Sequence, residues 1–491
     1  MKRLPTLLSH LTPKLALVLA PLLLAGCAYT PPEAADPGPL SAHWLQGPAA
    51  GTPASQEPWW RAFNDVTLNQ LEDEALAGNL DMQQAEARLQ QLRALVDNAS
   101  AAMLPSASVE AQTGRVYQSL DSGLGTLSNI VPNYPRAVDA DRLALGGAWD
   151  LDFAGSLRAQ REGARATLAA TYAERDTVRL SVSAEVASAY LQLAAARRDT
   201  AALQRRVDLL LDQRTVMEKR ASVGAASQDD VDRLTAMESE ARASLPGLAG
   251  LVASLEVRLA VLRGHDPSSP DRVVATQAEV PLAADPTGGA PADVLRQRPD
   301  VRSAEARLAA SRSRVQAAMS EYYPKLSLSA AVGFDSAQSS LLGQQSSVFG
   351  QGILGLRWRL FDFKRIDAEI ASAKGQEQEA LAGYRAAILR AGADVENSFS
   401  DVAHNRERLF VLQAQQQLAL KRLATVQRAW RAGASSRDDT LGAEQEALRL
   451  DTLVNGARRD VALAIVGASR SLGQPIPSAA RNAGPESATP R

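Results

Sequence analysis

The chain has 491 residues, of which 22% are charged and 4% aromatic, and its formal net charge at pH 7 is −2. This near balance carries no mark of a nucleic-acid or polyanion binder, so no nucleic-acid partner is expected. A single cysteine excludes an internal disulfide, and four scattered histidines have no metal-ligand spacing, so the sequence predicts neither a metal site nor a cofactor.

The N-terminus predicts a signal peptide over residues 1–26. Basic residues precede the apolar run 15–24, which is too short to span a bilayer. The run ends in Leu24-Ala25-Gly26-Cys27, which resembles the lipobox of bacterial lipoproteins. This resemblance implies acylation of Cys27, and the following Ala28 implies the outer membrane as the destination. The alternative is an ordinary signal peptide with a cysteine near its cleavage site.

A lipidated tether and a long helix are expected next. Residues 27–58 are rich in proline, alanine and glycine, which predicts an extended tether. Trp59-Trp60-Arg61-Ala62-Phe63 opens the folded part, and we interpret the paired tryptophans as core packing. From Asp65 to about Met103, apolar residues recur every three or four positions, which predicts one helix.

After Pro105 the hydrophobic period changes from that of a helix to the alternation of strands. Strands are predicted at about 104–116 and 140–153, and again at about 324–336 and 351–362. These lengths suit tilted strands that cross a bilayer with one apolar and one polar face. A soluble antiparallel sheet with one buried face produces the same alternation and is the alternative. Aromatic residues gather at one end of the strand pairs, as in an interfacial girdle: Tyr322, Tyr323, Trp358, Phe361, Phe363, Trp149 and Phe153.

Charged residues on the polar face of these strands are candidate lumen residues. They are Arg357 and Arg359 in one strand and Asp150 and Asp152 in its counterpart. Such charges either select ions or simply hydrate a polar lumen.

Two proline-free segments, 156–223 and 365–432, each predict a helix of about 68 residues, or roughly 100 Å. Gly224 and Gly433 supply the C-terminal stops. Ser227 and Ser436 then cap returning helices at about 228–263 and 437–472.

These elements occur twice. Gln84–Leu89 returns as Ser303–Leu308 at an offset of 219 residues, and Trp149 returns as Trp358 at an offset of 209. The sequence therefore predicts a tandem duplication of about 180 residues. The first repeat spans 59–264, a linker 265–292, the second repeat 293–473 and a disordered tail 474–491.

Four strands in one chain leave two unpaired edges, which hydrocarbon does not tolerate. Three copies would supply 12 strands, an even number that encloses a water-filled lumen. The predicted fold is an α+β membrane protein: a homotrimeric 12-stranded β-barrel, four strands per chain, continued by a long α-helical barrel.

Several motifs resemble the TolC-like outer-membrane factors of tripartite efflux systems, in the lipoprotein branch that works with resistance-nodulation-division pumps (OprM- and NodT-type). The resemblance runs from Cys27 to about Gly473 and implies a passive exit duct for drugs or other toxic small molecules. It implies a periplasmic adaptor and an inner-membrane pump as partners, insertion in outer-membrane lipid with extension into the periplasm, and no chemistry of its own. The motifs are Trp59-Trp60-x-x-Phe63, Asn79-Leu80-Asp81 with Ala85-Glu86-Ala87-Arg88-Leu89, Arg298-Pro299-Asp300-Val301 with Ala304-Glu305-Ala306-Arg307-Leu308, and Tyr323-Pro324-x-Leu326.

The resemblance also implies acidic residues that narrow the pore at the periplasmic tips. Asp439 aligns with such a position, and the family's second acidic position, one helical turn on, is Gly442 here. Alternatively, Ser227-x-x-Asp230 and Ser436-x-x-Asp439 are capping boxes that only stabilise helix starts. The candidate aperture residues are Asp438, Asp439, Asp229 and Asp230, with Arg431 and Arg437 as salt-bridge partners.

Two other classes of protein share some of these features. A lipid-anchored periplasmic adaptor would carry one helical hairpin between small β-domains, and a structural coiled coil would lack both strand pairs. An enzyme finds no support, because the sequence contains no GxSxG, P-loop or HExxH motif.

Overall fold

The structure is a computed structural model that describes residues 43–47, 57–121, 126–268, 279–286, 288–474 and 476. It divides into two compact units. Of the described residues, the first unit, here called the sheet unit, contains Gln90–Ala169 and Ala306–Ala382. The second, here called the hairpin unit, contains the remainder. The predicted signal peptide, Cys27 and nearly all of the tail lie outside the described residues.

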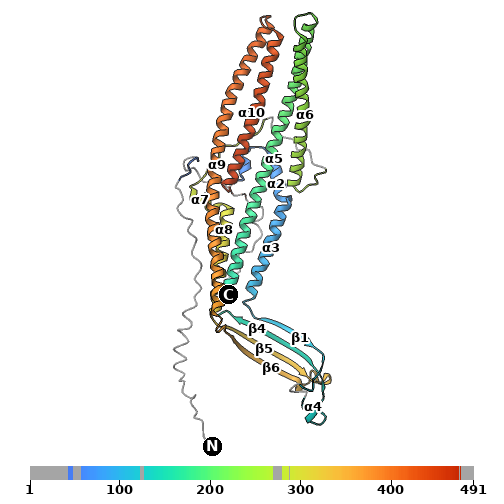
Figure 1. Ribbon diagram of the computed structural model, residues 1–491, viewed down its shortest axis with the longest axis vertical. Coiled ribbons are helices and arrows are strands. Elements are labelled where there is room, and N and C mark those ends of the chain that lie inside the picture. Colours follow the sequence, from blue (N-terminus) through green and yellow to red (C-terminus); the bar gives the residue numbers. More distant parts are fainter. Residues whose placement is uncertain are drawn as a thin grey trace. The chain divides into compact units, whose positions relative to one another are not determined.

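The sheet unit is built on four antiparallel strands in the order β1-β4-β5-β6 (Figure 1). Their bounds are β1 Ser106–Gln112, β4 Asp141–Leu151, β5 Lys325–Ser336 and β6 Val348–Arg357. A short antiparallel ribbon, β2 Arg115–Tyr117 with β3 Ala137–Asp139, and helix α4 (Leu127–Ile130) lie in the loop between β1 and β4, and the 3₁₀ turns η3 (Ser339–Leu341) and η4 (Gln345–Ser347) connect β5 to β6.

Three predicted strands have wrong ends. The strand predicted at 104–116 ends at Gln112, and Arg115–Tyr117 form the separate strand β2. The strand predicted at 140–153 ends at Leu151, and the one predicted at 351–362 spans Val348–Arg357 instead. After Arg357 the backbone leaves the extended conformation, and Phe361 adopts a left-handed φ of 64°. Hydrophobic alternation continued past the strands because aromatic and aliphatic residues also occupy the turns into the long helices.

The hairpin unit consists mainly of two antiparallel helix pairs, α5 with α6 and α9 with α10 (Figure 1). Their bounds are α5 Ser156–Ser222, α6 Gln228–Leu262, α9 Phe363–Arg431 and α10 Arg437–Ser471. Helices α5 and α9 contain 67 and 69 residues and contribute to both units, which agrees with the predicted long helices. Gly224 and Gly433, with φ values of 71° and 76°, follow them as helix stops.

The single helix predicted at 65–103 is two helices, α2 (Val66–Gly78) and α3 (Leu80–Ala101). Asn79 breaks it because its backbone is extended and its side chain takes over the hydrogen bonding. The Asn79 Oδ1 atom accepts from the N–H groups of Asp81 and Met82, and its Nδ2 donates to the carbonyl oxygen of Leu262 at 2.9 Å. The remaining helices are η1 (Trp59–Phe63), α7 (Pro291–Gln297), α8 (Pro299–Met319) and η2 (Ser320–Tyr322).

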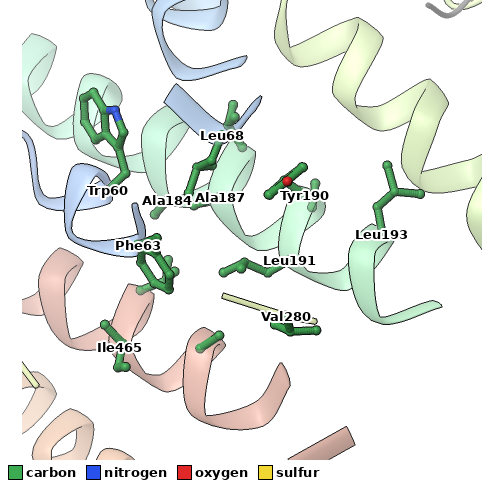
Figure 2. Packing of buried hydrophobic residues seen from close by; sticks show 14 of the residues in the cluster. Trp60, Phe63, Leu68, Ala184, Ala187, Tyr190, Leu191, Leu193, Val280 and Ile465 are labelled. Carbon is green, nitrogen blue, oxygen red and sulfur yellow. The ribbon is translucent and has the colours of Figure 1, made fainter. Parts of the chain in front are cut away.

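Tryptophan and leucine side chains from η1 and α2 form a core against α5 (Figure 2). Trp59 contacts Trp60 and Phe63 edge-on, with ring centroids 5.8 and 6.4 Å apart, and all three are buried. The interpretation of the paired tryptophans as core packing is confirmed. Tyr190 of α5 donates its hydroxyl to Asp65, whose other carboxylate oxygen caps α2.

Part of the predicted tether is bound to the hairpin unit. Trp44 packs edge-on against Phe399 and donates its indole N–H to the Gly289 carbonyl oxygen at 3.0 Å. The N–H groups of Leu45 and Gln46 donate to the two carboxylate oxygens of Glu396 at 2.7 and 2.8 Å. Residues 43–47, here called the clasp, are therefore fastened to α9.

Length and composition mark one helix of the described part, Gln228–Leu262, as able to cross a membrane. Only 22% of its most apolar window is buried. Length and composition alone are weak grounds for a membrane span, and α6 is the returning arm of the first hairpin (Figure 1).

Candidate functional site

The four-stranded sheet has one apolar face. Paired residues of antiparallel strands share a face, and the face alternates along each strand. Registers such as Leu145 with Val332 and Leu328 with Leu354 therefore place one row of side chains together. This face comprises Ala107, Val109, Ala111, Leu143, Leu145, Gly147, Trp149, Leu151, Leu326, Leu328, Ala330, Val332, Phe334, Val348, Gly350, Gly352, Leu354 and Leu356.

The apolar face is also exposed. Leu354 and Val109 keep 69% and 71% of their surfaces accessible, and no other described element covers the row. Monomeric soluble proteins rarely expose a contiguous apolar patch of this extent, because each Å² of it forgoes about 25 cal/mol. A soluble sheet with one buried face therefore does not describe this unit, and lipid is the solvent that suits it.

The opposite face carries mainly small and polar residues, with Phe349 and Ile353 as apolar exceptions, and part of the predicted lumen set. Asp150 lies on it in β4, paired with Ser327, and Arg357 lies on it at the end of β6, paired with Lys325. Other polar residues of this face are Ser106, Ser108, Glu110, Gln112, Arg142, Ser329, Asp335 and Gln351.

Asp152 and Arg359 are not strand residues, so their assignment to the strands is wrong. The Asp152 carboxylate accepts from the N–H groups of Leu157 and Arg158 at 2.9 and 2.8 Å, so it caps α5. Arg359 is bound by acidic side chains from its own turn and from α9, Asp362 at 2.7 Å and Glu369 at 2.9 Å. Both side chains stabilise the turn that joins a strand to a long helix.

In each half of the chain, a tryptophan at the end of the second strand donates a hydrogen bond to the segment that precedes the first strand. Trp149 donates its indole N–H to the carbonyl oxygen of Met103, and Trp358 does the same to Tyr322, both at 3.0 Å. The residues correspond through the 219- and 209-residue offsets. The sequence predicts these aromatic residues at one end of the sheet but not their hydrogen bonds, for which the repetition of both tryptophans is the available signal.

At the helix tips, both Ser-x-x-Asp segments form capping boxes. Ser436 Oγ accepts from the Asp439 N–H while Asp439 accepts from the Ser436 N–H, each at 3.0 Å, and Ser227 and Asp230 do the same at 3.2 Å. These bonds favour the ionised carboxylate: the Ser436 hydroxyl and then its N–H lower the pKa of Asp439, and Ser227 likewise lowers the pKa of Asp230. The capping interpretation is confirmed for both residues, and the aperture role stays a prediction.

The ion pair of Asp438 involves a different arginine from the two that were predicted. Asp438 pairs with Arg220 of α5 at 3.6 Å, which joins the two hairpins. Arg437 turns away from the tip acids, toward Asp212 at 3.7 Å and over the Trp430 ring. In the described part of the chain neither Asp229 nor Arg431 has an ion pair with another tip residue, although both lie in terminal helical turns. Arg220 was missed because it belongs to the other half of the sequence.

Further polar contacts join α5 to α10 along the hairpin unit. Gln445 donates to Gln213 at 2.7 Å, and Arg198 pairs with Asp451 at 3.0 Å. The buried Asn455 donates to Asp199 at 2.7 Å. Across the described residues no group of three or more His, Cys, Asp or Glu side chains is arranged to hold a metal ion.

The whole arrangement matches one protein family. The family model described as "Outer membrane efflux protein" matches residues 71–265 and 290–474. The chain is 30% identical over 394 residues to the pyoverdine export outer membrane protein OpmQ of Pseudomonas aeruginosa, covering 79% of this chain and 81% of that protein. It is 26% identical over 442 residues to nodulation protein T of Rhizobium leguminosarum bv. trifolii, covering 86% and 89%.

The fold matches as well. The solved outer-membrane channel OprN superposes with a TM-score of 0.77 at 29% identity, covering 92% of this chain and 99% of that one. The resemblance to TolC-like, OprM- and NodT-type proteins is therefore confirmed. Because the family model covers more than half of the chain, this protein belongs to the outer membrane efflux protein family, and it is an outer-membrane exit duct of the tripartite efflux type that extends into the periplasm.

Proposed function

We propose that three copies of this chain close a 12-stranded β-barrel in the outer membrane, continued by an α-helical barrel, and that the assembly passively conducts small molecules delivered by a periplasmic adaptor and an inner-membrane resistance-nodulation-division pump. One observation carries the proposal: a four-stranded sheet with an exposed apolar face and two edge strands, β1 and β6, each of which pairs on one side only in the described chain. Open edges are not stable in hydrocarbon, so other copies must complete the sheet.

The alternative of a periplasmic adaptor or structural coiled coil without its own pore does not account for this sheet. Either protein would have to cover or lack the apolar face. The assembly test is purification from outer-membrane fractions followed by planar-bilayer recording. We expect a species of about three times the 52.2-kDa chain mass with stepwise conductance, and a monomer from inner-membrane fractions would contradict the proposal.

We propose that Cys27 carries the lipid anchor and lies at the start of a tether that the clasp fastens to α9. Several acyl chains form a stable anchor, at about 0.8 kcal/mol per buried methylene. A Cys27→Ser variant should lose incorporation of labelled palmitate, while a Ser41→Ala variant in the same tether should keep it. Equal labelling of both variants would exclude Cys27 as the acceptor.

We propose that Asp438 and Asp439 restrict the periplasmic tip as well as starting α10, with Arg220 holding Asp438 across the two hairpins. The support is the 3.6 Å Asp438–Arg220 contact, a link that capping does not require. Single-channel conductance of Arg220→Ala and Asp438→Ala should exceed that of the wild type. Ser436→Ala is the matched control, because it removes the capping hydroxyl and keeps every tip charge. If the control rises as much as the charge variants, only helix capping is at work.

The substrate class proposed is toxic or secreted small organic molecules, drugs included. It is supported by family membership and by the relative named for pyoverdine export. Deleting the gene and measuring which compounds accumulate in cells tests this. Unchanged retention of every compound, in cells whose pump and adaptor remain expressed, would oppose an efflux role.

A further inference from the structure

The register of the strands recurs between the two halves of the chain. In the first half β1 pairs with β4, beginning with Ser106 opposite Ala148. The positions 219 and 209 residues later are Lys325 and Arg357, and they are paired in β5 and β6. All seven pairs of the first hairpin map in this way onto pairs of the second, up to Gln112 with Arg142, which becomes Ala331 with Gln351.

The junction between the halves is also known. Strand β4 leaves the first half and pairs with β5, which enters the second, with Gly147 opposite Ala330 and Ala148 opposite Ser329. The equivalent junction at the other side would join β6, which leaves the second half, to a β1 strand that enters a first half. Within this chain β1 and β6 are the two edges of the sheet (Figure 1), so the β1 strand must belong to a second copy.

We propose that β6 of one copy pairs with β1 of the next in the register of the β4–β5 junction, which places Arg357 opposite Glu110 of the neighbouring copy. Moving the β4 positions forward by 209 and the β5 positions back by 219 turns the pair Ala148–Ser329 into Arg357–Glu110. The same shift turns Gly147–Ala330 into Leu356–Ala111. This inference rests on the proposed closure of the barrel by several copies and specifies the residues that close it.

The charges agree with this register. Glu110 is the only charged residue of β1, and Arg357 is the only one of β6. Both are exposed, and neither has an ion pair with another residue in the described part of the chain. Registers shifted by two or four residues would leave Arg357 opposite Ser106, Ser108 or Gln112, without a carboxylate.

The positions inside the chain explain why the charges belong between copies. The intrachain counterparts of Arg357 and Glu110 are Ala148 and Ser329, which are small and neutral. An opposite-charge pair directly across two strands stabilises their pairing. The pair therefore occurs only where two copies meet, and it favours β6 binding to a β1 strand over a slipped alignment.

The apolar faces agree as well. Leu356 and Ala111 lie on the apolar face of their own sheets, and the register sets them opposite each other. Leu356 is 65% exposed in the single chain, as expected of a side chain on a lipid-facing edge. A shift by one residue would bring the polar face of one copy to the apolar face of the next, so only even shifts compete.

Cysteine cross-linking in outer-membrane fractions tests the register. Directly paired residues lie within disulfide reach, with Cα atoms about 4.5–5.5 Å apart, whereas residues two positions out of register do not. Ala111→Cys with Leu356→Cys should give disulfide-linked dimers and trimers on mild oxidation. Ala111→Cys with Leu354→Cys is the matched control. Each single-cysteine variant shows how much cross-linking involves the native Cys27.

The outcomes of this experiment test the proposed register separately from the proposed barrel. Preferential cross-linking of the control pair, or of neither pair in a wild-type-like conducting trimer, would overturn the register and leave the proposed function standing. A wild-type chain that neither assembles nor conducts would refute the proposed function itself.

Charge reversal tests the Arg357–Glu110 pair without cysteines. Glu110→Arg should lower the temperature at which the trimer dissociates on a gel, and adding Arg357→Glu should restore it. Ser108→Arg is the control, because it adds the same side chain to the same face two residues away, and Arg357→Glu should not rescue it. A double variant no more stable than Glu110→Arg alone would exclude the ion pair.

Discussion

At the scale of single residues, Glu72 of α2 is a carboxyl group in the core. Its side chain is 0% exposed, and in the described part of the chain neither carboxyl oxygen has a hydrogen-bond partner. Burial therefore raises its pKa well above the ordinary value. The neighbouring Ser183 hydroxyl of α5 lowers this pKa by less than burial raises it.

We expect Glu72→Gln to stabilise the protein at neutral pH. A carboxyl whose folded pKa is raised contributes no penalty below its unfolded pKa, and it destabilises progressively as pH rises toward the folded value. Glutamine removes this dependence, so the thermal midpoints of wild type and variant should converge near pH 4 and differ at pH 8. The difference at pH 8 should correspond to on the order of 1 kcal/mol in the free energy of unfolding. Equal midpoints at both values would mean that the carboxyl is hydrated in the native state. Glu74→Gln is the control, because that side chain is half exposed and paired with Arg263.

Gly333 is a second residue whose role depends on its surroundings. A Cβ atom at this position would lie 2.1 Å from the Leu143 carbonyl oxygen and 2.6 Å from the Ala144 Cα atom. Strand β5 therefore approaches β4 more closely at this point than any side chain allows.

We expect Gly333→Ala to reduce assembly of the proposed trimer several-fold, because β4 must move away from β5 to admit the methyl group. Gly350→Ala in β6 is the matched control, since nothing lies within 4 Å of its added Cβ. Folded protein in outer-membrane fractions is the measurement. Normal assembly of the Gly333 variant would show that the strands adjust freely.

At the scale of elements, the clasp joins a segment rich in proline and glycine to α9. The two N–H groups of residues 45 and 46 share one carboxylate, and the Trp44 ring lies against Phe399. Charge-assisted hydrogen bonds of this kind are roughly twice as strong as neutral ones. Residues 43–47 are consequently held against α9, although no secondary structure is predicted there.

We expect Glu396→Gln to loosen the clasp, because the amide accepts only one of the two hydrogen bonds. The loss should be about 1–3 kcal/mol of local stability and should appear as faster proteolysis of residues 28–58 in intact outer-membrane protein. Glu407→Gln, on the same helix, should leave the cleavage rate unchanged. A clasp variant that resists protease like the wild type would show that Trp44 packing alone suffices.

At the scale of the whole molecule, equivalent contacts recur at positions related by the offsets. The capping boxes, the glycine stops and the indole hydrogen bonds each occur once in either half. This recurrence supports the proposed duplication, and with three copies it would produce six similar sectors. The halves differ at the tips, where Asp438 forms an ion pair with Arg220. They also differ at the edges of the sheet, where Glu110 and Arg357 lie in β1 and β6.

We expect Trp149→Phe and Trp358→Phe to destabilise the proposed trimer by similar amounts, about 0.5–1.5 kcal/mol each, because each removes one indole hydrogen bond. Trp430→Phe, at the opposite end of α9, is the control for the loss of a tryptophan. The dissociation temperature of the purified trimer is the measurement. A strongly unequal effect of the two variants would contradict structural equivalence of the two indole hydrogen bonds.

Much of this architecture follows from local pattern. Hydrophobic alternation located all four strands and the long proline-free segments located α5 and α9, because side-chain periodicity reflects which face of an element is apolar. The capping boxes were equally visible, since Ser-x-x-Asp satisfies hydrogen bonds within four residues. The pattern failed at Asn79 and Asp152, where a side chain accepts backbone N–H groups and starts a helix. It also failed at Arg359, which lies in a turn and pairs with acidic side chains of that turn and of α9.

The sequence by itself determined the class of fold, the family and the two-sided character of the sheet, because these depend on the order and spacing of residues along the chain. Only the tertiary structure decided the strand register, the buried state of Glu72, the clasp on Glu396 and the cation that meets Asp438. Each of these depends on residues far apart in sequence, and a pattern within one element carries no information about which distant atom lies opposite it.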